Sequence, residues 1–112
     1  MSQHPGDGSD LEGVLTATDL VAFQSGAVVS RALVKKPTGT VTAFAFDAGE
    51  GLSEHTAPFD ALIFALEGHA EITIAGAAFS VGSGELLRLP AGKPHAVKAS
   101  SPFKMLLIMI RA

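Results

Sequence analysis

The sequence predicts an all-β domain, a sandwich or barrel of short antiparallel strands, and three observations support this class. The 12 glycines and 6 prolines are spread as punctuation between short apolar runs. β-branched residues and Phe populate those runs, as is typical of strands. The connections between the runs are short enough to be turns between antiparallel neighbours. Many short strands separated in this way are typical of sandwiches and barrels.

Most strands can be assigned in order along the chain. The first clear run ends at Lys35-Lys36-Pro37, and later runs end at turns such as Ala75-Gly76. Pro102 precedes the last and most apolar run. The predicted strands are 27–34, 40–46, 62–66, 70–74, 77–81, 86–89, 95–99 and 103–110.

The N-terminal region is less regular. Residues 10–15 and 18–23 are each too brief for periodicity to decide between a short helical turn and an edge strand. Residues 1–10 have no apolar run and no basic flank, so we expect a flexible tail rather than a secretory signal. The remaining residues, 11–112, suffice for a single domain with one core.

Composition excludes several classes of protein. The absence of Cys excludes a disulfide framework, a thiolate nucleophile and a sulfur-rich zinc site, and a cytoplasmic location is the default expectation. The longest apolar run, 105–110, is far shorter than the roughly 20 residues of a membrane-spanning helix. The net charge of −3 is made of mixed charges, and there is no Trp or Tyr to stack on bases. We therefore expect neither a membrane nor a nucleic acid as partner.

The last predicted strand is apolar on both of its faces, whereas one face of a solvated barrel wall should be polar. Something must cover the outer face, because a large exposed apolar patch is unusual on a soluble monomer. A second copy of the same wall, packed across a two-fold axis, would cover this face, so we expect a homodimer. The alternative is that the N-terminal segment folds back over this face.

Two histidines stand in separate glycine- and proline-rich frames. In the first frame, Gly49 is followed after five residues by His55, and the frame closes at Gly68. In the second, Gly84 is followed after five residues by Pro90-Ala91-Gly92, and two residues later by His95. Both histidines lie where strand patterns begin or end, so a small barrel can bring both imidazoles to one cavity.

The two frames resemble the two sequence motifs of the cupins, and the resemblance covers about residues 40 to 110. It implies a double-stranded β-helix, the jelly-roll barrel of the cupins, with a ligand site in the barrel mouth. It also implies a homodimer, which is common among cupins of this size. Of the metal-ligating motif positions, only His55 and His95 carry over. Ala57 stands where the first motif has its second histidine, and Ala61 stands where it has its glutamate. Ala99 stands where the second motif has its closing asparagine.

A catalytic divalent ion usually takes three protein ligands and keeps an open position. Asp60 is the candidate third ligand beside His55 and His95. Strict alternation from His55 places Asp60 on the opposite face, but a bulge at Pro58 would re-aim it. The alternative for Asp60 is a solvated carboxylate or a turn acceptor. We expect Glu54 to be a rim charge, His69 to lie on the surface and His4 to lie in the tail.

The cavity walls follow from strand parity, counted from Ala61. The three alanines at motif positions would enlarge the cavity and make it more apolar. An apolar pocket with two polar anchors suits a small organic molecule as ligand. The predicted pocket residues are Ala57, Phe59, Ala61, Ile63, Phe79 and Leu89.

Three functions agree with these features. The first is an enzyme in which a divalent transition metal (Fe, Mn, Ni, Co or Zn), bound by His55 and His95, acts as a Lewis acid on a small oxygenated substrate. The second is a non-catalytic, metal-free module that binds a small molecule, because imidazoles can also hydrogen-bond a ligand. The third is a structural dimer with a vestigial pocket. The sequence does not identify a substrate or a reaction.

Overall fold

The structure of the protein is a computed structural model, and it describes residues 12–111. The tail predicted over residues 1–10, with His4, lies outside the described residues. The described part contains nine strands and one turn of 3-10 helix, η1. These elements are η1 (Ala17–Asp19), β1 (Val28–Lys36), β2 (Gly39–Phe46), β3 (Gly51–His55), β4 (Asp60–Glu67), β5 (His69–Ile74), β6 (Ala77–Gly82), β7 (Leu86–Leu89), β8 (His95–Ala99) and β9 (Phe103–Ile110).

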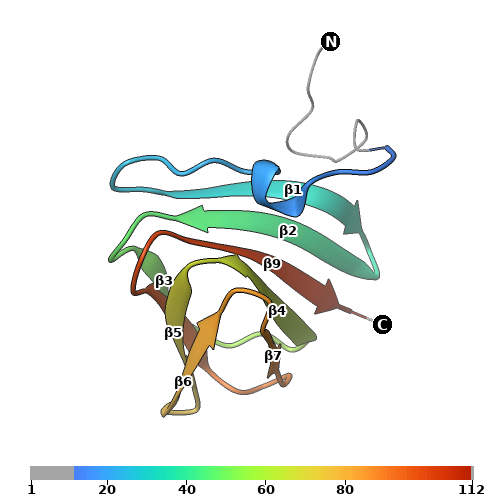
Figure 1. Ribbon diagram of the computed structural model, residues 1–112. Coiled ribbons are helices and arrows are strands. Elements are labelled where there is room, and N and C mark those ends of the chain that lie inside the picture. Colours follow the sequence, from blue (N-terminus) through green and yellow to red (C-terminus); the bar gives the residue numbers. More distant parts are fainter. Residues whose placement is uncertain (1–11, 112) are drawn as a thin grey trace.

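The strands form two antiparallel sheets (Figure 1). The larger sheet has the strand order β1-β2-β9-β4-β7, and the smaller has the order β3-β8-β5-β6. Strands that are neighbours in the sequence often belong to different sheets: β3 and β8 lie in the smaller sheet, whereas β4 and β9 lie in the larger. The chain therefore winds back and forth between the sheets, and the predicted all-β double-stranded β-helix is confirmed.

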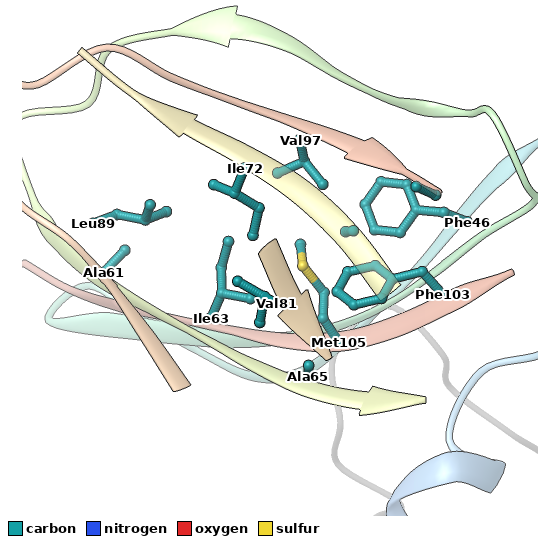
Figure 2. Packing of buried hydrophobic residues seen from close by; sticks show 12 residues of the cluster. Phe46, Ala61, Ile63, Ala65, Ile72, Val81, Leu89, Val97, Phe103 and Met105 are labelled. Carbon is teal, nitrogen blue, oxygen red and sulfur yellow. The ribbon is translucent and has the colours of Figure 1, made fainter. Parts of the chain in front are cut away.

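The core lies between the two sheets, where each contributes the side chains of its inward face (Figure 2). Phe46 and Phe103 are fully buried, and their ring centroids lie 5.8 Å apart. The larger sheet contributes Ile63 and Met105 to this cluster, and the smaller sheet contributes Ile72. Burying each such side chain is worth about 1.5–3 kcal/mol, so this core is the main reason that the sheets stay closed.

Most of the predicted strands are present within a residue or two of their predicted bounds, but β3 was not predicted. Its sequence, Gly-Leu-Ser-Glu-His, contains a single large apolar side chain, and most of the strand is exposed. Both histidines lie at one end of a strand, as expected: His55 ends β3, and His95 begins β8. Of the two ambiguous segments, the described residues of the first form no strand, and the second begins in the 3-10 turn η1.

The outer face of the larger sheet is covered in part by the N-terminal strap, which we define as residues 12–27. Leu20 and Val21 of the strap pack on the outward side chains of Ala43 and Ala45. The buried Lys104 holds the strap, because its Nζ donates a hydrogen bond of 2.6 Å to the carbonyl oxygen of Thr18. The expectation that the N-terminal segment folds back over this face therefore holds for one part of it.

Further along the same outer face, apolar side chains remain partly exposed. On β4, outward residues alternate with the buried Ala61, Ile63 and Ala65. We call the uncovered outward residues the open face, which comprises Leu62, Phe64, Leu86 and Ile108. Leu86 is 59% exposed. No helix in residues 12–111 is long and apolar enough to span a membrane.

Truncating Phe103 tests the core between the sheets. We expect Phe103→Ala to lower the free energy of unfolding by about 3–5 kcal/mol, since it removes buried apolar surface and leaves a cavity. The matched control is Phe79→Ala on β6, where the side chain is 43% exposed, and we expect a loss of about 1 kcal/mol or less. Urea unfolding followed by circular dichroism measures both. Equal losses would contradict this placement of the core.

Candidate functional site

The pairing of β3 with β8 brings the two motif histidines together. His55 and His95 are direct partners in the antiparallel register of these strands. Their ring centroids lie 4.3 Å apart, and the ring planes meet at 68°. The two imidazoles are therefore immediate neighbours, although forty residues of chain separate them.

Glycine makes this pairing feasible at the other end of β3. A Cβ atom at Gly51 would collide with the backbone carbonyl oxygen of Val97 in β8. Any larger residue would push β3 away from β8 and disturb the register that aligns the histidines. The ladder continues beyond β3, where the Ala99 N–H donates to the carbonyl oxygen of Glu50 at 2.8 Å and the Gly49 N–H donates to that of Ala99 at 2.9 Å.

The proline-rich turn before His95 is fastened to the segment that follows His55. The Gly92 N–H donates to the Ala57 carbonyl oxygen at 2.9 Å, and Gly92 has a φ of 80°, which favours glycine. The Ala91 N–H donates to the Asp60 Oδ1 at 2.9 Å, and Arg88 lies 3.6 Å from the same oxygen. Asp60 is thus the acceptor for this turn, the alternative role considered for it from the sequence.

Each histidine ring has its Nδ1 directed at a backbone carbonyl. The Nδ1 of His55 lies 2.9 Å from the Ser53 oxygen, and the Nδ1 of His95 lies 3.3 Å from the Lys93 oxygen. A carbonyl oxygen can only accept, so Nδ1 must carry the hydrogen in both rings. In the neutral form, the lone pair of each ring is then on Nε2. This is the tautomer that histidine ligands of metals commonly adopt, with the other nitrogen donating to a carbonyl.

The two rings differ in their exposure to water. His95 is 8% exposed, whereas His55 is on the solvent side. Burial lowers the pKa of His95 below its ordinary value of 6.5, and the neighbouring His55 lowers it further, while the hydrogen bond to Lys93 acts in the opposite direction. His95 therefore stays neutral at neutral pH, with its Nε2 lone pair available.

The two histidines line a small cavity whose other walls are apolar. Its volume is about 20 Å³, which is room for roughly one water molecule. Ile63 and Leu89 line it as predicted from the sequence. Side chains from β3, β8 and β9 were missed in the sequence analysis; parity along β8 from His95 and along β9 would have identified most of them. The lining is completed by Leu52, Val97, Met105 and Leu107.

The other predicted pocket residues lie elsewhere. Ala61 belongs to the core beside the cavity. The Arg111 guanidinium carbon lies 5.0 Å from the centroid of the Phe59 ring. Phe79 lies on the edge strand β6, and 43% of its surface is exposed. Ala57 takes part through its carbonyl in the turn described above. The alanines at motif positions do not open a large cavity, because the larger side chains around the histidines fill the space.

The donor set for a metal is limited to the two imidazoles. Within residues 12–111, no three His, Cys, Asp or Glu side chains come together as a group that could hold a metal ion. The full ligand set implied by the cupin motifs therefore does not fit the described part of this chain, which brings together only the two imidazoles at this place. Glu54 is exposed, as expected for a rim charge. His69 is also exposed, and it lies at the opposite end of β5 from Ile74, the partner of His95.

A double-stranded β-helix with its two histidine motifs on paired strands defines the cupin class. The family described as "Cupin_2: Cupin domain" matches residues 43–110, and the chain belongs to this family. The resemblance seen in the sequence is therefore confirmed. No curated protein matches the chain.

Three solved structures illustrate the similarity. A conserved protein of unknown function from Streptococcus pyogenes is 32% identical, with 100% of this chain and 98% of that chain covered and a TM-score of 0.89. A cupin superfamily protein from Desulfitobacterium hafniense DCB-2 is 27% identical, with 98% and 100% covered and a TM-score of 0.85. A cupin 2 conserved barrel domain protein from Leptotrichia buccalis is 42% identical, with 83% of this chain and 45% of that chain covered and a TM-score of 0.80. None of these descriptions states an activity.

The lowered pKa of His95 predicts how stability depends on pH. With a chelator present, the unfolded chain takes up a proton on this ring near pH 6.5, whereas the folded protein does so only at lower pH. The free energy of unfolding should be highest above pH 6.5 and fall as the pH drops from 6.5 towards the pKa of the folded state. In His95→Gln this component should be missing. Chemical unfolding at a series of pH values measures it, and parallel pH curves for the two proteins would contradict the prediction.

Proposed function

We propose that His55 and His95 bind one divalent transition metal ion, of the class Fe, Mn, Ni, Co or Zn, through their Nε2 atoms. The observation that carries this proposal is the pairing of the rings 4.3 Å apart, each with Nδ1 at a backbone carbonyl. Imidazole nitrogens bind these metals at about 2.0–2.1 Å. Two rings this close can both reach a single ion.

The number of protein ligands determines the kind of site. With two imidazoles, the remaining coordination positions are left for water or for oxygen atoms of a small organic ligand. Such an ion would supply Lewis-acid chemistry to that ligand when bound. The exposed side of His55 is the side from which a ligand approaches. His95 holds its Nε2 in the neutral form, and the fastened proline turn fixes its orientation.

The alternative proposal is a metal-free module that binds a small molecule, or a structural dimer with a vestigial site. The absence of a third protein ligand among the described residues favours it. Against it stands the cavity of about 20 Å³, because pockets for organic ligands usually measure about 300–1,000 Å³. An ion or a water molecule fits this space, and an organic molecule would have to lie at the mouth beside His55.

Metal titration distinguishes these proposals. We expect the protein, after treatment with chelator and desalting, to bind Ni²⁺, Co²⁺ or Zn²⁺ in isothermal titration calorimetry, with one ion per chain. His55→Ala and His95→Ala should each weaken this binding by at least about tenfold, since even indirect partners of a metal ligand contribute that much. Elemental analysis of the freshly purified protein beside its His55→Ala variant should show metal only in the former.

The control for this titration is Asp60→Asn. The amide oxygen can still accept from the Ala91 N–H, so the turn is kept, while the carboxylate charge is lost. We expect metal affinity to change by less than about threefold; a larger loss would identify Asp60 as the third ligand. An unchanged response of wild-type protein and both histidine variants to every metal would overturn the metal proposal and leave the alternative.

We also propose that the chain forms a homodimer, in a cytoplasmic setting, through the outer face of its larger sheet. The strap leaves the four large apolar side chains of the open face partly exposed, and their burial against a second copy would remove them from water. The clustering of these residues on one face supports this proposal.

Sedimentation velocity over a range of protein concentrations tests the self-association. We expect the wild type to sediment as a dimer and Leu86→Glu to shift the equilibrium towards the monomer, since the variant places a charge in an apolar interface. The matched control is Phe79→Glu, which alters an exposed apolar residue on the smaller sheet and should leave the dimer intact. A wild type that is monomeric at all concentrations would contradict the proposal.

A further inference from the structure

A groove lies at one end of the outer face of the larger sheet, where the β1–β2 hairpin meets the end of β9. Its volume is about 250 Å³ and its walls include Val34, Val41, Ile108 and Ile110. Val34 is 43% exposed and Ile110 is 51% exposed. The groove is thus far larger than the cavity of about 20 Å³ beside the histidines. The packing of Leu20 and Val21 on Ala43 and Ala45 does not extend to it.

Near its start the strap carries two exposed apolar residues, Val14 and Leu15. Val14 is fully exposed, at 102%, and Leu15 is 47% exposed. They are adjacent in the sequence and precede η1, whereas the residues of the strap that pack on the sheet, Leu20 and Val21, follow η1. The strap therefore carries an apolar pair in addition to the pair that it uses on its own sheet.

The rest of the chain offers little to fill the groove. Residues 1–11, which lie outside the described part, contain only Met1 and Leu11 as large aliphatic side chains. The remainder of that segment is glycine, proline and polar residues. Among the exposed large apolar side chains of residues 12–111, Val14 has the highest exposed fraction, at 102%. Leu86 already belongs to the open face, and Phe79 lies on the smaller sheet. Val14 and Leu15 from another molecule are therefore the apolar side chains that suit the groove.

Charge also matches between the groove and the strap. Lys36 lines the groove, and Lys35 beside it is exposed. The first 30 residues contain no Lys or Arg, and the acidic residues nearest to Val14 are Asp10 and Glu12. On β4, the register partner of Ile110 is the acidic Asp60, whose carboxylate is already engaged by the Ala91 N–H and by Arg88. An acidic residue, Glu12, beside two aliphatic residues is thus complementary to an apolar groove with Lys36 at its rim.

We propose that Val14 and Leu15 of one copy fill the groove of a second copy, and that the second copy does the same in return. The inference rests on the homodimer proposed above and adds a second contact to the one made by the open face. A two-fold axis requires such reciprocity, because each surface must meet its complement on the partner. Glu12, two residues before Val14, then lies beside Lys36 of the other chain.

Cross-linking tests the contact, and the natural absence of Cys makes single-cysteine variants unambiguous. One chain carries Leu15→Cys and another carries Val34→Cys. The two are mixed and treated with a short bis-maleimide, which tolerates small misfits of geometry. We expect a covalent heterodimer from this mixture and none from the control mixture of Leu15→Cys with Phe79→Cys. No product from the first mixture, or equal product from both, overturns the inference.

A second variant measures the contribution of the contact. Val14→Asp combined with Leu15→Asp changes only exposed side chains, so its urea unfolding should match the wild type when both are monomeric. Its dimer dissociation constant should rise by at least about a hundredfold, because two aliphatic side chains no longer leave water. An unchanged constant overturns the inference. If the wild type sediments as a dimer while both tests fail, the homodimer stands without this contact, and the metal titration is unaffected by either outcome.

Discussion

The register between β3 and β8 is the constraint on which the site depends. β3 is short and mostly exposed, and it contributes little to the core besides Leu52. It is held instead by the close approach of its backbone at Gly51 and by the ladder that continues through Glu50 and Gly49 to Ala99. A slip of one residue would turn the ring of His55 to the other side of the sheet. Backbone contacts at the start of β3 therefore determine whether the two imidazoles meet.

This chain lacks most of the polar ligands of the cupin motifs, and apolar side chains fill the interior of its barrel. Alanine stands at the motif positions 57, 61 and 99, and aliphatic side chains from both sheets close around the remaining two histidines. The result is a core that runs without interruption up to His95, with a space of about 20 Å³ beside the rings. This environment explains why His95 remains neutral, since an imidazolium there would lose hydration and lie against a second ring. A site of this kind favours a compact guest over a bulky one.

The fold could be predicted from the sequence because turns and apolar runs alternate almost throughout, as in 70–74 and 103–110. The exception was β3, whose single large apolar side chain gives no alternation to recognise. For the site, the glycine frames identified both histidines and strand parity identified Ile63 and Leu89. Parity also assigned Phe79 to the pocket, and it does share a register pair with Ile72, but β6 is a sheet edge, so this position is open to water. The role of Asp60 at the turn depends on a contact with Ala91, 31 residues away, which no local pattern encodes.

The strap changes where the boundary of the folding unit should be drawn. The region that matches the cupin family, 43–110, omits β1 and the strap, yet Lys104 within it is buried and donates a hydrogen bond to Thr18 of the strap. Without the strap, the ammonium of Lys104 would lose the carbonyl of Thr18 and the ring of Phe23, which lies 4.8 Å away. It would keep the Glu67 carboxylate, whose Oε1 lies 3.9 Å away, while Ala43 and Ala45 would lose the cover of Leu20 and Val21. A fragment trimmed to residues 43–110 would consequently expose the surface of Ala43 and Ala45 that the strap covers, so an expression boundary drawn from family resemblance alone would remove part of the packing on the sheet.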